Sequence, residues 1–297
     1  MSIKTILVPV NGVGETSPAL EVGLGLARRL EAHLEVLHVA LDPRDSVAFL
    51  GEGMTGAMIE EIMTVTEREA KERGARASAL FEALCARHEA PIAEGGVKPE
   101  AGYSAAYLAT TGREEEQVAL RGRLADLIVV SRPLADDQGP PPTTLEAALR
   151  ETGRLVLVVP SAPPPEPLPK LPMEFGTCVA IAWNGSVEAG RAITAALPLI
   201  AGANRVLVYS VGEDGLPGGN AREVVRDLAW HGVEAAGETL EASPRTVGTR
   251  LLGAAAEAGA DLLVMGAYTR SRVRRLIFGG VTREVLEGAD IPLLMAH

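Results

Sequence analysis

Aromatic residues and cysteines are scarce in this chain. Phe, Trp and Tyr make up 3% of the 297 residues, so a core must be built mainly from aliphatic side chains. Cys85 and Cys178 make neither a disulfide framework nor a metal motif at their spacing, and we interpret them as small buried residues in a reducing compartment. No apolar run approaches the roughly 18 residues that span a bilayer, and no signal-peptide pattern opens the chain. We therefore expect a cytoplasmic protein without membrane contact.

Basic residues are outnumbered. The chain has 28 Lys and Arg against 39 Asp and Glu, for a net charge of −11. Such a chain repels polyanions, so broad nucleic-acid binding is not expected. Apolar residues (47%) and charged residues (23%) are in globular proportion, and the length suggests about two domains.

The motifs of common catalytic and metal sites are also missing. There is no Gly-x-x-x-x-Gly-Lys, no Gly-x-Ser-x-Gly and no His-Glu-x-x-His. The histidines are scattered along the chain, at His33, His38, His88, His231 and His297. Nothing pairs a nucleophile with a base, so we predict a protein that is not an enzyme and holds no metal.

What the chain does contain is an internal repeat. Four segments of each half correspond: Thr5–Gly12 with Cys178–Gly185, Leu34–Val39 with Val206–Val211, Ala125–Ser131 with Ala260–Gly266, and Gly153–Val159 with Ala289–Met295. The offset is 172–173 in the first two pairs and 135–136 in the last two, so the first half carries about 37 additional residues. These lie within 42–103 and predict a long helix, roughly Gly56 to Arg87, with a charged, solvated face.

Each half alternates short aliphatic runs with helical periods, which predicts an α/β fold with a parallel sheet covered on both faces. In the second half we expect strands near 177–183, 205–211, 233–240, 261–265 and 291–295, and helices near 187–200, 220–230, 245–258 and 281–288. The proline-rich stretch 160–172 predicts a semi-rigid spacer. We expect a first domain over 1–160, a linker over 161–174 and a second domain over 175–297. Ligands of such sheets bind where the strand order reverses, which here means the loops after strands one and four.

The loop after the fourth strand of the second half is the most basic stretch of the chain. Its arginines are Arg270, Arg272, Arg274, Arg275 and Arg283. Gly279 and Gly280 then precede a helical period that contains Thr282. A glycine pair at a helix start lets a phosphate approach backbone N–H groups, and the helix dipole favours the anion. The alternative is a solvated loop whose arginines balance nearby carboxylates.

The loop after the first strand of the second half contains Asn184 and Ser186. They can cap the next helix, or Asn184 can hydrogen-bond a ribose or base in the same crevice. Val211 ends the second strand, where backbone groups can read an adenine edge. The first half has no glycine pair at the equivalent helix start, and its loop 11–17 is a truncated dinucleotide fingerprint, so we expect no site there.

These segments resemble the universal stress protein family in its tandem two-domain form, over nearly the whole chain. The strongest pieces are the first strand and its loop in both halves, Ala260–Gly266, and Gly279–Leu286. The resemblance implies two Rossmann-like domains of the adenine-nucleotide alpha-hydrolase type, each a five-stranded parallel sheet sandwiched by helices. Members usually dimerise through the last strand, which implies an intramolecular pseudo-dimer of the two halves and leaves a homodimer open.

ATP-binding members of that family carry Gly, two residues, Gly, nine residues, then Gly followed by Ser or Thr. The spacing is kept here, but Thr269 replaces the second glycine, Gly280 the final Ser or Thr, and Asn184 the aspartate after strand one. The resemblance implies adenine and ribose contacts at Ala182, Asn184 and Val211. It implies phosphate contacts at Gly266, Thr269, Arg270, Arg272, Gly279, Gly280, Val281 and Thr282.

The leading hypothesis is a stress-response protein that binds ATP or a related adenine nucleotide in its C-terminal domain and acts as a sensor rather than an enzyme. Thr269 and Gly280 favour the first alternative, a scaffold of the same family that binds protein partners and no nucleotide. The second alternative is an adenine-nucleotide enzyme with weak ATPase activity, against which the absence of a catalytic base argues.

Overall fold

The computed structural model describes residues 2–13, 17–44, 55–93, 102–133, 141–160, 175–212, 220–241, 246–267 and 280–297. They form two compact units, one of Lys4–Thr152 and one of Gly153–His297 with the N-terminal residues up to Ile3. The expected linker, 161–174, lies outside the described residues, and the domain limits expected from the sequence remain a prediction.

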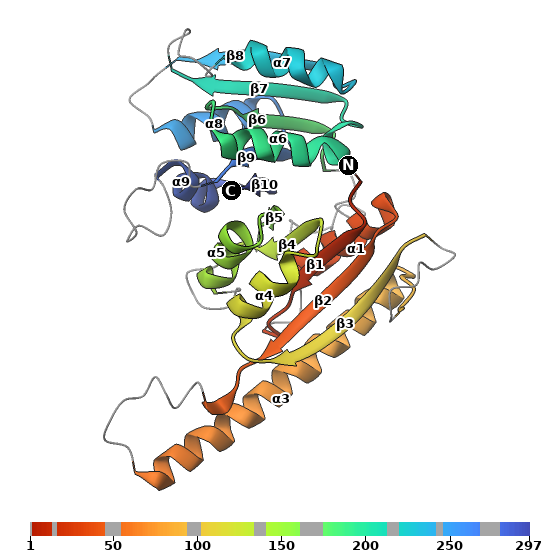
Figure 1. Ribbon diagram of the computed structural model, residues 1–297, viewed down its shortest axis with the longest axis vertical. Helices are drawn as coiled ribbons and strands as arrows, with labels where there is room; N and C mark the ends of the chain where they lie inside the picture. Colours follow the sequence, from red (N-terminus) through yellow and green to blue (C-terminus); the bar gives the residue numbers. More distant parts are fainter. Residues whose placement is uncertain are drawn as a thin grey trace. The chain divides into compact units, whose positions relative to one another are not determined.

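The first unit is a parallel sheet of four strands with the order β3-β2-β1-β4. The strands are β1 (Thr5–Pro9), β2 (His33–Ala40), β3 (Ser104–Thr111) and β4 (Leu127–Ser131). They alternate with α1 (Pro18–Leu30), α3 (Gly56–Arg87), α4 (Glu114–Gly122) and α5 (Pro142–Glu151) (Figure 1). Strands β1 and β4 are aliphatic and almost wholly buried, as expected for a parallel sheet between two layers of helices.

Helix α3 has the bounds that the sequence predicts. Thr55 caps its start, where the side chain accepts a hydrogen bond from the backbone N–H of Met58. Only the C-terminal part of α3 carries buried side chains, among them Phe81 and Cys85. The ring of Phe81 lies 5.6 Å from that of Tyr107 on β3, which attaches this end of the helix to the sheet.

The second unit is a six-stranded sheet with the order β5-β10-β9-β6-β7-β8. Its strands are β5 (Leu155–Val159), β6 (Cys178–Ala182), β7 (Arg205–Val211), β8 (Ala235–Leu240), β9 (Leu262–Gly266) and β10 (Leu293–Ala296). Its helices are α6 (Val187–Ile200), α7 (Ala221–Trp230), α8 (Val247–Glu257) and α9 (Gly280–Gly288). Five strands are parallel, and β5 joins antiparallel to β10, with Leu157 opposite Leu294.

The strand order reverses between β6 and β9. The chain runs from β6 outward to β7 and β8, then returns to β9 on the other side of β6. The expected alternation of strands and helices is confirmed, and the loops after strands one and four of this half start from neighbouring strands. Such a reversal leaves a crevice at the carboxyl ends of the two central strands.

One aspartate holds the start of the first strand in each unit. Asp126 accepts hydrogen bonds from the backbone N–H groups of Lys4 and Thr5, at 2.8 and 3.0 Å. Asp261, its counterpart in the repeat, accepts from the N–H groups of Gly176 and Cys178, at 2.8 and 3.1 Å. The Ala-Asp-Leu motif of the repeat is therefore structural: it satisfies backbone donors where a central strand begins.

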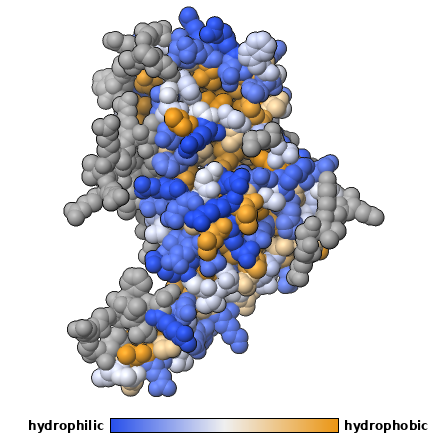
Figure 2. Space-filling view, viewed as in Figure 1, coloured by the Kyte–Doolittle hydropathy of each residue, from blue (hydrophilic) through white to orange (hydrophobic). Residues whose placement is uncertain are grey.

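The visible surface is mostly hydrophilic, with hydrophobic side chains in small, separated groups (Figure 2). Large exposed hydrophobic residues include Leu124 and Trp230. Scattered apolar residues of this kind are normal on a protein surface. Within the described ranges, no helix is long and apolar enough to cross a membrane.

Candidate functional site

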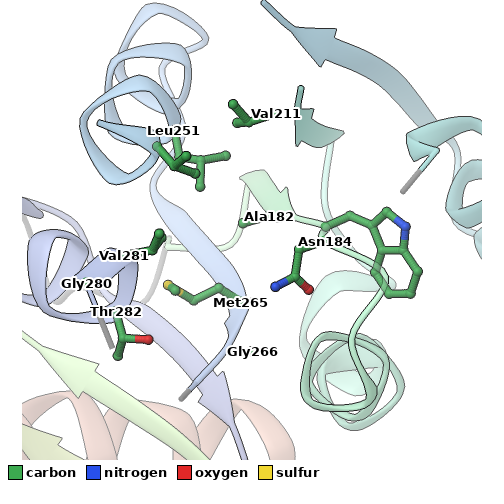
Figure 3. A pocket seen from close by; sticks show the side chains of 11 residues that line it. Ala182, Asn184, Val211, Leu251, Met265, Gly266, Gly280, Val281 and Thr282 are labelled. Atoms are coloured by element: carbon green, nitrogen blue, oxygen red, sulfur yellow. The ribbon is translucent and has the colours of Figure 1, made fainter. Parts of the chain in front are cut away.

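A cavity of about 400 Å³ lies at the carboxyl ends of β6, β7 and β9, where the strand order reverses. Figure 3 shows its lining, which comes from the loop after β6, the end of β7, the start of α8, the end of β9 and the start of α9. Seven residues expected from the sequence line it: Ala182, Asn184, Val211, Gly266, Gly280, Val281 and Thr282. The other expected residues, Thr269, Arg270, Arg272 and Gly279, lie outside the described residues.

One side of the cavity is apolar. Ala182, Leu251 and Met265 are buried and present aliphatic or thioether surface. Val247 and Leu251 also line the cavity but were not among the residues expected from the sequence. Their spacing of four places them on one face of a helix, which is the signal that could have found them. An apolar wall with a few convergent polar groups is typical of a small-molecule site.

The loop after β6 is held by its own side chains. Asn184 Oδ1 accepts a hydrogen bond from the backbone N–H of Ser186 at 3.1 Å, and Ser186 Oγ accepts from the N–H of Ala189 at 3.1 Å. Gly185 between them has φ +74°, a left-handed conformation that favours glycine. Ser186 is therefore the cap of α6, and Asn184 closes an Asx turn that leaves it exposed at the cavity.

Gly266 has a packing reason to be glycine. A Cβ atom added there would lie 2.5 Å from the backbone N of Ala189, at the start of α6. Because Gly266 has no side chain, the start of α6 can pack directly against the end of β9, and the loop after β6 lies beside it. The glycine is thus explained by packing alone, whatever occupies the cavity.

The start of α9 forms another wall of the cavity. No described residue lies within 4 Å of a Cβ atom added at Gly280, which lines the cavity. Thr282 is 5% exposed and lies in the first turn. Arg283, part of the basic stretch, donates from Nε to Glu287 at 2.7 Å along the same helix. Glu284, also on α9, accepts a hydrogen bond from the backbone N–H of Gly248 at 3.1 Å, and this bond links α9 to the start of α8.

The described lining residues carry no ionisable side chain. The shifted pKa values belong to groups elsewhere: burial raises the pKa of the Cys85 thiol on α3 to about 11, and it raises the pKa of Glu114 on α4. In the part of the chain that the structure describes, no group of three or more His, Cys, Asp or Glu could hold a metal ion. The cavity offers shape, apolar surface and hydrogen-bond donors.

In the first unit, the loop after β1 is in contact with helix α3. Asn11 Oδ1 accepts from the N–H of Val13 at 3.0 Å, the same turn as at Asn184. Here, however, Arg76 of α3 donates from Nε to the backbone oxygen of Gly12 at 3.0 Å. A Cβ atom added at Gly12 would lie 2.2 Å from the backbone oxygen of Arg73, so α3 contacts the loop directly. Most of the loop after β4 lies outside the described residues.

Comparison with known proteins links the second half of the chain to a family. The sequence model of the universal stress protein family matches residues 179–297. No curated protein matches the chain.

Solved structures share the fold over 99% of the chain. A universal stress protein from Archaeoglobus fulgidus DSM 4304 aligns with a TM-score of 0.68 at 16% identity, over 96% of its own length. A protein from Pseudomonas aeruginosa UCBPP-PA14 that bears the same family name aligns with a TM-score of 0.54 at 14% identity, over 93% of its length. A functionally unknown protein from Pseudomonas aeruginosa PAO1 aligns with a TM-score of 0.52 at 12% identity, over 92% of its length.

Proposed function

We propose that the half of the chain that matches the sequence model of the universal stress protein family, residues 179–297, binds ATP or a related adenine nucleotide and acts as a sensor without catalysing a reaction. The observation that carries the proposal is the cavity at the strand-order reversal, lined by residues from both loops expected to hold the ligand. Its volume of about 400 Å³ is in the range of small-molecule sites.

The described residues fit the parts of such a nucleotide. Val211, Leu251 and Met265 offer an apolar surface against which a flat base can lie. The first turn of α9 lines the cavity, and the free N–H groups and positive dipole end of a helix start suit a phosphate, which can approach the backbone closely at Gly280. Arg270 and Arg272, by their place in the sequence, would add positive charge.

The absence of ionisable side chains from the described lining supports a binding role. General acid–base catalysis needs a titratable group within hydrogen-bond reach of the reacting atoms. Thr282 and Asn184 can donate hydrogen bonds but do not titrate near neutral pH. The site as described can hold and orient a ligand.

Mass spectrometry of the purified full chain and calorimetry with ATP would test the proposal. We expect copurified adenine nucleotide, or heat of binding at or below millimolar ATP. Gly280→Asp should abolish binding, because its carboxylate at the cavity wall would repel the phosphates. Gly280→Asn has nearly the same shape without the charge and serves as its control. Absence of both copurified nucleotide and heat would refute the proposal.

The first alternative is a scaffold that binds protein partners instead of nucleotide. Gly280 favours it, since this residue lacks the hydroxyl that ATP-binding relatives carry there. Trp183 lines the cavity and distinguishes the two proposals. Its fluorescence should change with ATP if the cavity is a nucleotide site and stay constant for the scaffold. An enzyme would be favoured by slow ATP hydrolysis that Thr282→Ala abolishes and Thr282→Ser retains.

We extend the proposal to an intramolecular pseudo-dimer of the two sequence repeats in a cytoplasmic protein. The support is the pairing of β5, the last strand of the first repeat, with β10, the last strand of the second. Light scattering on the purified chain should then give the mass of one 31.1 kDa chain. A stable mass of twice that value would favour a homodimer instead.

A further inference from the structure

The side chain of Asn184 presents a defined polarity to the cavity. Its Oδ1 atom accepts the hydrogen bond from Ser186, a role that the amide nitrogen cannot take because it has no acceptor lone pair. The Nδ2 atom therefore lies on the other side of the carboxamide. Figure 3 shows it on the side that faces Met265, across the cavity. Asn184 thus offers the cavity an N–H donor.

This orientation is a property of the loop. Asn11 makes the same turn in the first unit, where Gly12 has φ +66° and Gly185 in the second unit has φ +74°. The first-unit loop lies against α3 and lines none of the cavity described above. The local chain therefore fixes which end of the carboxamide points away from the turn, independently of any ligand.

The labelled residues divide the cavity into three regions in Figure 3. Val211 and Leu251 form an apolar region, Gly280 and Thr282 mark the start of α9, and Asn184 lies apart from both. The next step rests on the proposed function. If the base occupies the apolar region and the 5′-phosphates meet α9, the ribose lies between them, with its hydroxyl edge toward Asn184.

We infer that Asn184 makes this site selective for adenine nucleotides whose ribose carries a phosphate at the 2′ or 3′ position. A ribose hydroxyl can donate or accept, so it suits a carboxylate or an amide. A phosphate oxygen only accepts and is charged, so a carboxylate here would repel it while an N–H group binds it. The described lining of the cavity holds no acidic residue that would oppose this phosphate.

The inference can be tested with ligands that differ in one feature. ADP, adenosine 2′,5′-bisphosphate and adenosine 3′,5′-bisphosphate share base, sugar and number of phosphates, and differ in where the second phosphate is attached. Calorimetry with the full chain should show one of the two bisphosphates binding at least about tenfold more tightly than ADP. The test depends on the ratio of the bisphosphate affinity to the ADP affinity, and not on either absolute value.

Asn184→Asp should abolish or reverse this preference. Its carboxylate can still accept from the N–H of Ser186, so the turn is kept while the donor becomes a charged acceptor. Asn184→Ala removes both the donor and the acceptor for the N–H of Ser186 without adding a charge, and should lose the preference without reversing it. Asn11→Asp makes the matched change in the first unit and should leave all three affinities unchanged.

Equal affinities for the three ligands, or a preference that survives in Asn184→Asp, would overturn this inference while the proposed nucleotide binding stands. If none of the three ligands nor ATP binds, the inference and the proposed function are both wrong.

Discussion

The loop after the first strand is the same in both halves, yet it meets different surroundings. Asn11 and Asn184 each close an Asx turn, at 3.0 and 3.1 Å, and each is followed by a glycine with positive φ. In the first unit the loop accepts a hydrogen bond from Arg76 of α3. In the second unit it lines the cavity. The same local turn therefore contacts a helix in one unit and lines a cavity in the other.

The difference originates in the segment between the second and third strands. In the first unit it contains the 32-residue helix α3, and in the second unit the 10-residue helix α7. The longer helix brings Arg73 and Arg76 onto the loop. The two equivalent loops therefore differ in whether a helix far away in the sequence contacts them.

The largest expected effect is at Gly12, where α3 contacts the loop. Gly12→Ala should lower the free energy of unfolding by about 3 kcal/mol, because its Cβ would lie 2.2 Å from the backbone oxygen of Arg73 at a positive φ. Gly232→Ala has a similar φ of +74° with open space around it, and should cost only about 1 kcal/mol. Denaturant unfolding measures both. Equal losses would show that the helix contact is unimportant.

The paired aspartates come next. Asp126→Ala and Asp261→Ala should each cost about 2 kcal/mol, because each leaves several backbone donors at a strand start without an acceptor. Both tryptophans, Trp183 and Trp230, are in the second half, so fluorescence reports on that half while circular dichroism reports on both. If the halves unfold independently, only Asp261→Ala shifts the fluorescence transition. A fluorescence shift with both variants would show that the halves unfold together.

The third prediction concerns the start of α9. Gly280→Ser should increase ATP affinity about tenfold, since no described residue obstructs the added side chain and its hydroxyl can donate to a charged phosphate. Gly280→Ala controls for the loss of glycine and should leave the affinity nearly unchanged. Calorimetry distinguishes them. An equal gain in both variants would mean that helix stability, and no hydroxyl contact, is responsible.

The smallest expected effect is a pH dependence in the first half. Burial raises the pKa of Glu114, the nearby Glu115 adds to the rise, and the hydrogen bond from Thr144 at 2.7 Å opposes it. The folded state therefore holds this proton more tightly than the unfolded state. Its contribution to stability is complete below the unfolded pKa and is lost as pH rises through the folded pKa.

Glu114→Gln should make the free energy of unfolding depend less on pH as the pH rises above the ordinary pKa of a glutamate. The amide oxygen can still accept from Thr144, so the contact between α4 and α5 remains. Glu116→Gln, an exposed change in the same helical turn, should leave the slope as it is. An unchanged slope in Glu114→Gln would show that another group titrates. In the second half, a hydrogen bond also joins the third and fourth helices, α8 and α9. Its donor is the backbone N–H of Gly248, and its acceptor is the carboxylate of Glu284.

Much of the fold could be predicted because its signals are local. The aliphatic runs and helical periods place the elements of the second half within a few residues of their observed bounds, and the bounds of α3 agree with the prediction. The site was predictable as far as the loops that contribute to it. Val247 and Leu251 were not expected, because α8 reaches the cavity only through the way it packs beside α9. The spacing of four shows that Val247 and Leu251 share one face of a helix, but a single sequence does not show which element that face packs against.

The sequence by itself determined the repeat, the helices and strands, and the turns at Asn11 and Asn184, because each depends on residues close together in the chain. Tertiary structure decided what each turn contacts among the described residues: the loop of Asn11 meets α3, and the loop of Asn184 lines the cavity at the ends of β6, β7 and β9. It also assigned Gly266 a packing role against α6 and the two aspartates a role at strand starts. The physical reason is that contacts between distant segments depend on helix length and sheet order, which equal local sequences do not specify.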